Sequence, residues 1–191
     1  MVKEWKILKE KTKPIKGESW ITSKEVLFLN PLTGKEKKFN LFGSKTDYGS
    51  TVLPVTEDKK VIALLEYMQG CNEVLLKLPG GAANFKGEDP SLIAERELSE
   101  ETGYKGRKII PLGCPFFWRE PRNSWVYTYL FIAEGCKKIK EQKCDFDEEI
   151  ELKLIPFEEW TRMVFEGEIK EAAAIIATFF SIEHFKKYGY L

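Results

Sequence analysis

Histidine and cysteine are scarce in this chain, and their arrangement excludes a common kind of metal site. The 191 residues contain one histidine, His184, and four cysteines, Cys71, Cys114, Cys136 and Cys144. No two cysteines form a Cys-x-x-Cys pair, so we do not expect a zinc site made of Cys and His. Scattered thiols of this kind are typical of a reduced, cytosolic protein.

Long apolar runs and an excess of one charge are also lacking. No window approaches the ~20 apolar residues of a membrane-spanning helix, and the Lys-rich segment 1–16 has no apolar core like that of a signal peptide. Lys plus Arg and Asp plus Glu number 30 each, so no strongly basic surface for nucleic acid is expected. We therefore expect a cytoplasmic protein with no membrane or nucleic-acid partner. A neutral total still allows one locally positive or metal-loaded cleft.

The length suits one domain with a hydrophobic core, preceded by a small extension. Residues 1–45 have the pattern of short strands and turns, with strands near 20–29 and 37–42 and a turn signal at 30–34. We assign residues 1–45 to an N-terminal β-rich extension and residues 46–191 to the main domain.

Within the main domain, strands flank one central helix and two helices end the chain. The apolar segments 49–56 and 61–67 flank a polar turn and predict a hairpin. Further strands are predicted near 73–78, 108–112 and 125–133, and helices near 157–166 and 171–187. This order predicts an α/β sandwich built on a mixed sheet.

The central helix has clear boundary signals. Asp89 suits the N-cap and Pro90 suits the first helical position. Gly103 suits the position just after the C-cap, where a left-handed residue commonly ends a helix. The sequence therefore predicts a helix over residues 90–102.

Three glutamates crowd one side of this helix. Glu97, Glu100 and Glu101 stand at i, i+3 and i+4, where like charges repel, and they lie near the C-terminal end, where the helix dipole disfavours anions. A divalent cation would compensate, because hard oxygen ligands suit Mg²⁺ or Mn²⁺. Arg96 lies one turn before Glu100 and can orient a carboxylate. The alternative is a solvated acidic surface, which is common in a Glu-rich chain.

The wider spacing favours the metal site. Glu88, seven residues and then Arg96-Glu97-Leu98-x-Glu100-Glu101-x-Gly103-Tyr104 resemble the Nudix box, G-x5-E-x7-R-E-U-x-E-E-x-G-U. With this chain's composition, six fixed positions would coincide by chance with a probability of about 10⁻⁴ over the chain. One departure is Ala82, which stands where the box has glycine, while Gly81 is one residue earlier. A one-residue insertion within 81–87 accounts for this.

The similarity extends to the ADP-ribose pyrophosphatase branch of the family. It is carried by the segments 53–58, 78–81, 87–90, 129–133 and 167–177, and it covers about residues 20–185. The resemblance implies a Nudix-type α/β/α sandwich and Mg²⁺-dependent hydrolysis, with Mn²⁺ as an alternative ion. It implies cleavage of a nucleoside diphosphate sugar to a nucleoside monophosphate and a sugar phosphate. The implied metal ligands are Glu97, Glu100, Glu101 and a carbonyl of Gly80 or Gly81, while Arg96 positions a glutamate and Glu88 supports the loop before the helix.

Other roles implied by the resemblance lie outside the box. A later acidic loop often supplies a base or a further ligand, and Glu148 and Glu149 are the candidates here; the alternative for either is an acidic surface loop. Trp20 is a candidate for stacking on a base, although a core or dimer contact is the alternative. Arg119 and Arg122 are candidates for holding phosphate, or else they are solvated loop arginines. The branch is commonly homodimeric with exchanged N-terminal strands.

Two departures leave the substrate open. Met68 stands where the branch often has arginine, and Lys77 stands where it usually has glutamate, so both members of an expected charge pair have changed. One alternative substrate is therefore another nucleotide sugar, such as GDP-mannose, or a dinucleotide. A non-catalytic nucleotide-binding sensor module is the alternative from another class, and the intact acidic helix argues against it.

Overall fold

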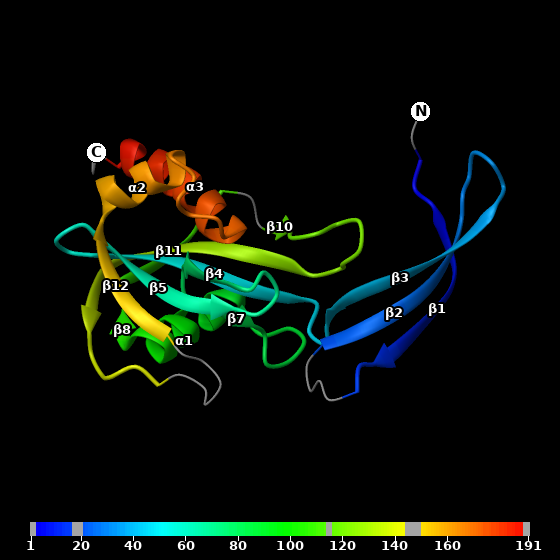
Figure 1. Ribbon diagram of the computed structural model, residues 1–191, viewed down its shortest axis with the longest axis horizontal. Helices are drawn as coiled ribbons and strands as arrows, with labels where there is room; N and C mark the ends of the chain where they lie inside the picture. Colours follow the sequence, from blue (N-terminus) through cyan, green and yellow to red (C-terminus); the bar gives the residue numbers. More distant parts are fainter. Residues whose placement is uncertain (1–2, 17–20, 114–115, 144–149, 189–191) are drawn as a thin grey trace.

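The computed structural model describes residues 3–16, 21–113, 116–143 and 150–188, which form two sheets and three helices (Figure 1). The first sheet is antiparallel and has the order β1 (Lys6–Pro14), β2 (Ile21–Leu29), β3 (Glu36–Ser44). The second sheet has nine strands, β4 (Tyr48–Thr56), β5 (Lys60–Met68), β6 (Glu73–Lys77), β7 (Gly80–Ala82), β8 (Tyr104–Lys105), β9 (Lys108–Pro111), β10 (Phe117–Trp118), β11 (Tyr127–Lys138) and β12 (Ile150–Pro156). The helices are α1 (Pro90–Thr102), α2 (Phe157–Phe165) and α3 (Ala172–Lys187).

Helix α1 begins and ends where the sequence predicts. The Asp89 side chain accepts a hydrogen bond from the Ser91 backbone N–H at 2.8 Å and caps the first turn. Pro90 occupies the first helical position, where its missing N–H costs nothing. Gly103 ends the helix with φ = 75°, a left-handed conformation that favours glycine.

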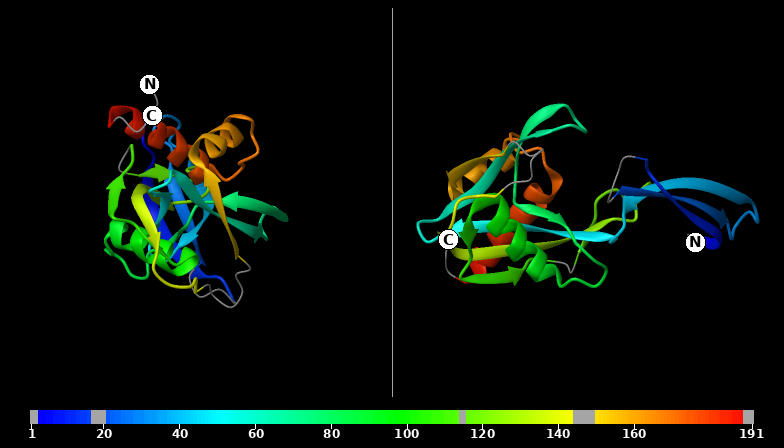
Figure 2. Two further views of the ribbon diagram at one scale, coloured as in Figure 1. Left: turned by 90° about the vertical axis from the view of Figure 1, so that its left-hand side faces the viewer. Right: turned by 90° about the horizontal axis from the view of Figure 1, so that it is seen from below.

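The nine-stranded sheet is mixed and lies between two layers of helix, which confirms the expected α/β/α sandwich (Figures 1 and 2). Strands β4 and β11 pair in parallel at its centre, and β5 pairs antiparallel with β12 and β6. Successive residues of β4 point to opposite faces. Val52 belongs to the core under α1, whereas Leu53 packs with Trp160 of α2 in the core under α2 and α3.

Several strands differ from the prediction. Residues 150–156 form β12, a strand that the sequence analysis did not predict. Strand β11 continues past Ala133 to Lys138, through an irregularity in its pairing with β4 between Glu134 and Cys136. In the N-terminal segment, β2 agrees with the strand predicted near 20–29, β3 is longer than the strand predicted near 37–42, and β1 was not predicted. Strands β11 and β12 pair with strands distant in the sequence, whereas β1 and β3 pair with the neighbouring β2.

The three-stranded sheet stands to one side of the sandwich (Figures 1 and 2). Every residue of β1 is exposed. The loop before β11 reaches back to this sheet, where the Phe42 N–H donates to the Asn123 carbonyl at 2.8 Å. The Trp125 indole N–H donates to Asp47 at 2.9 Å, and the Lys24 ammonium lies 4.4 Å from the Trp125 ring centroid. These contacts join the two sheets.

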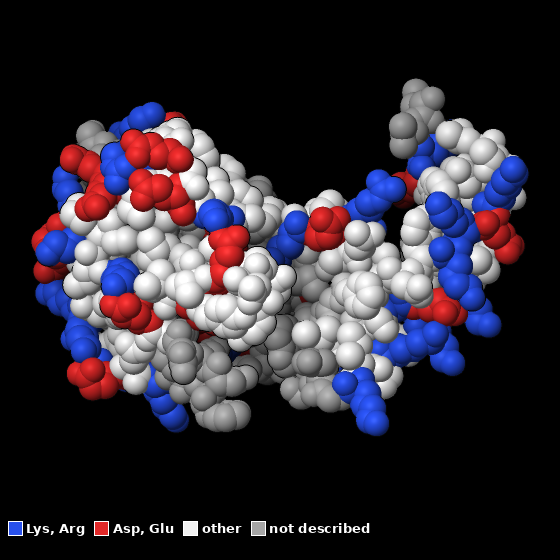
Figure 3. Space-filling view, in the orientation of Figure 1, with Lys and Arg blue, Asp and Glu red and all other residues white. Residues whose placement is uncertain are grey.

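The surface is hollowed between the sandwich and the N-terminal sheet, and basic side chains are prominent on that sheet (Figure 3). Strand β1 alone carries Lys6, Lys9, Lys11 and Lys13. Within the described parts of the chain, no helix is both long and apolar enough to cross a membrane.

Candidate active site

The short strand β7 brings a glycine loop against the acidic side of α1. Strand β7 pairs with the start of β4, where Gly81 lies opposite Ser50. A Cβ at Gly81 would collide with the carboxylate of Glu97, so the missing side chain allows this close approach. The Ser50 hydroxyl donates to the carbonyl of Pro90 at 2.7 Å and ties β4 to the first turn of α1. The glycine loop therefore packs closely against α1 at Glu97, and β4 is bonded to the first turn of the same helix.

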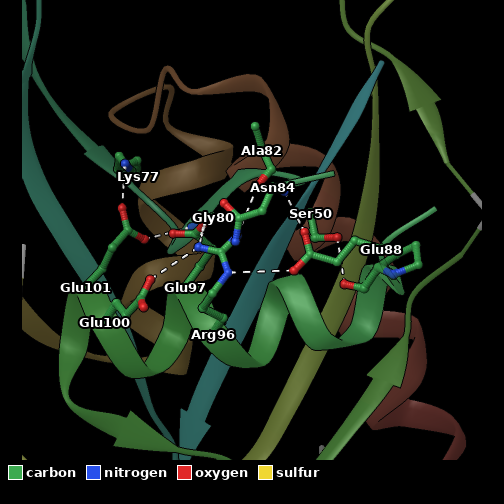
Figure 4. A network of polar contacts seen from close by, with 11 residues as sticks. Ser50, Lys77, Gly80, Ala82, Asn84, Glu88, Arg96, Glu97, Glu100 and Glu101 are labelled. Carbon is green, nitrogen blue, oxygen red and sulfur yellow. Dashed lines mark hydrogen bonds and ion pairs between the residues drawn. The ribbon is translucent and has the colours of Figure 1, made fainter. Parts of the chain in front are cut away.

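Glu101 is the most deeply buried of the three glutamates, with 6% of its side chain exposed. Its Oε2 accepts a hydrogen bond from the Gly80 N–H at 2.8 Å, and its Oε1 lies 3.1 Å from the ammonium nitrogen of Lys77 (Figure 4). Burial raises the pKa of Glu101 to about 7, although Lys77 and the Gly80 N–H oppose the shift. Each carboxylate oxygen thus has a defined partner.

Lys77 bridges two carboxylates. Besides Glu101, its ammonium nitrogen lies 2.7 Å from Oε2 of Glu66 on β5. Burial alone would lower the pKa of Lys77, but Glu101 and Glu66 outweigh this effect and raise it. Lys77 therefore stays protonated. The expected glutamate–arginine pair of positions 77 and 68 is replaced by an ion pair between positions 77 and 66.

Arg96 holds the other two glutamates. Its Nη1 lies 2.7 Å from Glu97 and 3.2 Å from Glu100, and its Nη2 donates to the carbonyl of Ala82 at 3.0 Å (Figure 4). Arg96 thus contacts two carboxylates, and its role in orienting one of them stays a prediction. Glu100 is the most open of the three glutamates, with 45% of its side chain exposed.

Glu88 braces the loop that precedes α1. Its Oε2 accepts a hydrogen bond from the Asn84 N–H at 2.6 Å, and its backbone carbonyl accepts one from the Tyr48 hydroxyl at 2.7 Å. The Arg96 Nε lies 3.9 Å from Oε1 of Glu88. These contacts tie residues 84–88 of the loop to β4 and α1.

A cleft of about 520 Å³ opens beside the glycine loop. Gly80, Gly81 and Lys77 form the side nearest α1, and Phe42 of the N-terminal sheet and Glu171 before α3 line it elsewhere. Residues from both sheets thus border one cavity of a size that suits a small ligand. A smaller cavity of about 340 Å³ lies near the β4–β5 turn and is lined by Arg107 and Glu134.

The structure brings together some of the predicted site residues and not others. Arg119 lines the cleft, whereas Arg122 is exposed on the same loop and is not among the lining residues. Trp20, Glu148 and Glu149 lie outside the described residues. The sequence did not reveal the contact of Lys77 with Glu101, or the positions of Met68 and Glu171 in the cleft wall. The only signal was the unusual Lys77 just before Leu78-Pro79-Gly80-Gly81.

The donors at α1 fit a hard divalent cation in kind. They are carboxylate oxygens on one side of a helix, next to a backbone loop without side-chain bulk at Gly81. Among the described residues, no three acidic, His or Cys side chains are gathered as a metal cluster. The reason is visible in the ion pairs, because Arg96 holds Glu97 and Glu100 while Lys77 holds Glu101. The acidic side of α1 thus has two cationic side chains as partners, and the predicted metal ligands stay a prediction.

Comparison with known proteins places this site in a family. The model of the NUDIX domain matches residues 46–178. The ADP-ribose pyrophosphatase of Bacillus subtilis (strain 168) is 29% identical over 127 residues, which cover 66% of this chain and 67% of that protein. The GDP-mannose pyrophosphatase of Yersinia pestis (strain Pestoides F) is 28% identical over 145 residues, 72% of either chain. A crystal structure described as an ADP compounds hydrolase has the same fold, with a TM-score of 0.81 at 18% identity over 100% of this chain and 99% of that one.

The chain belongs to the Nudix family. The box residues Glu88, Arg96, Glu97, Glu100 and Glu101 and its relatives identify it as an enzyme of the pyrophosphohydrolase type. It is related to ADP-ribose pyrophosphatases and to GDP-mannose pyrophosphatases.

Proposed function

We propose that this enzyme hydrolyses the pyrophosphate of a nucleoside diphosphate sugar of the ADP-ribose type, giving a nucleoside monophosphate and a sugar phosphate. One observation carries the proposal: Glu97 and Glu101 of α1 lie against Gly81 and Gly80, and these two glycines line a cleft of about 520 Å³. A pyrophosphate in this cleft would lie close to the acidic helix. The resemblance to the ADP-ribose branch supports the choice of substrate class.

We assign Mg²⁺ as the ion, with Mn²⁺ as an alternative. The ligands would be Glu97, Glu100, Glu101 and a backbone carbonyl of Gly80 or Gly81. When bound, the cation supplies charge neutralisation for the pyrophosphate and activation of the attacking water. Arg96 would keep Glu100 and Glu97 aligned, since it already contacts both.

The chain's own residues would then accept the proton of the water, bind the phosphate oxygens and stack on the base. A water oxygen bonds to one phosphorus while the bridging P–O bond breaks, and two phosphomonoesters leave. A carboxylate must accept the proton of the water, and Glu148 and Glu149 are our candidates. Arg119, at the cleft, and Arg122 would bind phosphate oxygens, and Trp20 would stack on the base.

A second candidate substrate is GDP-mannose. The relative that acts on it matches a longer stretch than the ADP-ribose pyrophosphatase, 145 against 127 residues. The altered residues Met68 and Lys77 both line the cleft, so they are placed to change substrate preference. The ratio of kcat/KM for ADP-ribose and GDP-mannose distinguishes the two candidates.

We also propose that the enzyme is a homodimer and that residues 1–45 form its dimerisation extension. Ile7 and Leu8 of β1 are 53% and 40% exposed, and Trp5 before it is 37% exposed. Apolar side chains on an uncovered sheet commonly mark an interface. Light scattering of the purified protein measures this directly, and a mass of one chain at micromolar concentration would contradict the dimer.

The decisive test is product release from a panel of ADP-ribose, GDP-mannose, other nucleotide sugars and dinucleotides with Mg²⁺, comparing the wild type with Glu101→Gln. We expect one nucleotide sugar to be cleaved to a monophosphate. The variant removes a charged ligand that contributes several kcal/mol in the transition state, so its kcat should fall on the order of a thousandfold. Unchanged turnover in Glu101→Gln would refute the ligand assignment, and no turnover of any compound by the wild type would refute the activity.

A further inference from the structure

One cationic side chain lies on the carboxylate that the proposed function requires as a metal ligand. The Lys77 ammonium is 3.1 Å from Glu101 Oε1 and 2.7 Å from Glu66 Oε2. The three side chains are 14%, 6% and 14% exposed, in the order Lys77, Glu101, Glu66. They come from β6, α1 and β5, so the triad joins three elements, and Lys77 also lines the cleft. Figure 4 shows Lys77 against Glu101.

We propose that Lys77 is an internal counter-ion that sets the affinity of the site for a divalent cation. It pairs with Glu101 when no cation is bound, and it pairs with Glu66 alone when Glu101 binds one. This inference rests on the proposed function, because it requires Glu101 to be a metal ligand.

The geometry shows which group has to move. Glu101 Oε2 is held by the Gly80 N–H at 2.8 Å, so the carboxylate is fixed in place from the backbone side. Oε1 is the oxygen that Lys77 contacts. The lysine side chain is a flexible four-carbon stem that carries a point charge, and it can withdraw from Glu101 without any shift of the backbone.

Electrostatics makes the two cations competitors. A divalent ion on Glu101 and an ammonium within hydrogen-bond distance of the same oxygen repel each other, and the repulsion is strong because the site is largely shielded from water. Glu66 offsets part of this repulsion, since it already lies 2.7 Å from the ammonium and can keep it as a partner. Lys77 should therefore weaken cation binding, whereas Glu66 should strengthen it.

Arg96 is different, although it also contacts two glutamates of the helix. Its guanidinium donates to the Ala82 carbonyl as well, which anchors it to the glycine loop. The partners of Lys77 in the triad are both carboxylates, and one of them is outside the acidic helix. Glu66 can therefore remain the partner of the Lys77 ammonium when Glu101 binds a cation.

The test measures Mn²⁺ affinity of the full chain, without substrate, by electron paramagnetic resonance of the free ion at pH 8. Outer groups that tune a metal site typically change affinity by about 10–100-fold, so we expect Lys77→Met to bind Mn²⁺ at least about tenfold more tightly and Glu66→Gln about tenfold more weakly. Lys105→Met is the matched control, because Lys105 pairs with Glu95 of the same helix at 3.2 Å but is 58% exposed. Its affinity should equal that of the wild type.

Opposite shifts of the Mn²⁺ affinity in Lys77→Met and Glu66→Gln would support the counter-ion proposal. A purely structural role of the triad would weaken Mn²⁺ binding in both variants. Equal or weaker binding by Lys77→Met would overturn the counter-ion proposal while leaving the enzyme's activity assignment intact. Lack of Mn²⁺ binding and of turnover in the wild type and all variants would instead overturn the proposed function. If Lys77→Met does not fold, Lys77→Gln serves in its place, and the rise in melting temperature with added Mn²⁺, larger in the variant than in the wild type, gives a second readout.

Discussion

Strand β1 of the small sheet and strand β4 of the sandwich are both nine residues long, but they differ in what covers them. In β4 of the sandwich, seven of nine residues are buried, whereas all nine residues of β1 are exposed. The large sheet has α1 on one face and α2 and α3 on the other, while the small sheet is free of helices in the described chain (Figure 1). Burial of apolar surface is the main favourable term in folding.

This difference indicates where stability and function reside. A three-stranded sheet without a covering layer has little apolar surface to bury and is marginal by itself. The sandwich can hold the acidic helix and the glycine loop in register on its own core. The N-terminal sheet adds one wall of the cleft, and its position depends on the junction around Trp125.

The largest effect on stability should come from the core under α1. Leu98 is fully buried between α1 and the sheet. Leu98→Ala leaves a cavity, and we expect it to lower the free energy of unfolding by about 3 kcal/mol. Urea denaturation followed by circular dichroism measures this. A loss below about 1 kcal/mol would mean that the sandwich core is less important than its burial indicates.

A smaller effect should follow from loosening the junction. Trp125→Phe removes the hydrogen bond to Asp47 and weakens the contact with Lys24. We expect a loss of about 1 kcal/mol in the free energy of unfolding. Hydrogen exchange should become faster in β2 and β3 but remain unchanged in β5. Faster exchange in β5 as well would show that the two sheets unfold as one unit.

The smallest effect should come from β1. Leu8→Ala truncates an apolar side chain that is 40% exposed, and in a single chain we expect a change within about 0.5 kcal/mol. The comparison between the sheets fails if a second chain covers β1. In that case, the loss in the free energy of unfolding would be larger and would depend on protein concentration. Denaturation at two concentrations a hundredfold apart distinguishes the two results.

The local sequence was sufficient to predict the elements whose ends carry strong boundary signals. The bounds of α1 follow from Asp89, Pro90 and Gly103, because capping residues act on the backbone beside them. The apolar segments of β4 and β5 were also evident. Strand β12, which pairs with β5 and has Leu154 opposite Ile62, was missed although apolar and charged residues alternate over 150–154, because this short segment directly follows an acidic run. Strand β1 was missed because its lysines gave no period-two pattern of burial.

The sequence by itself determined the family and the reaction class. The spacing of Arg96, Glu97, Glu100 and Glu101 follows the turns of one helix, which places such residues on one side wherever it folds, and Glu88 lies in the loop just before it. Only the tertiary structure decided which partner each glutamate has. Lys77 meets Glu101 because β6 and α1 converge at Gly80, and a contact between residues 24 positions apart depends on how whole elements pack. Because of this packing, Lys77 lies against Glu101, where we propose that it competes with the metal ion for that carboxylate.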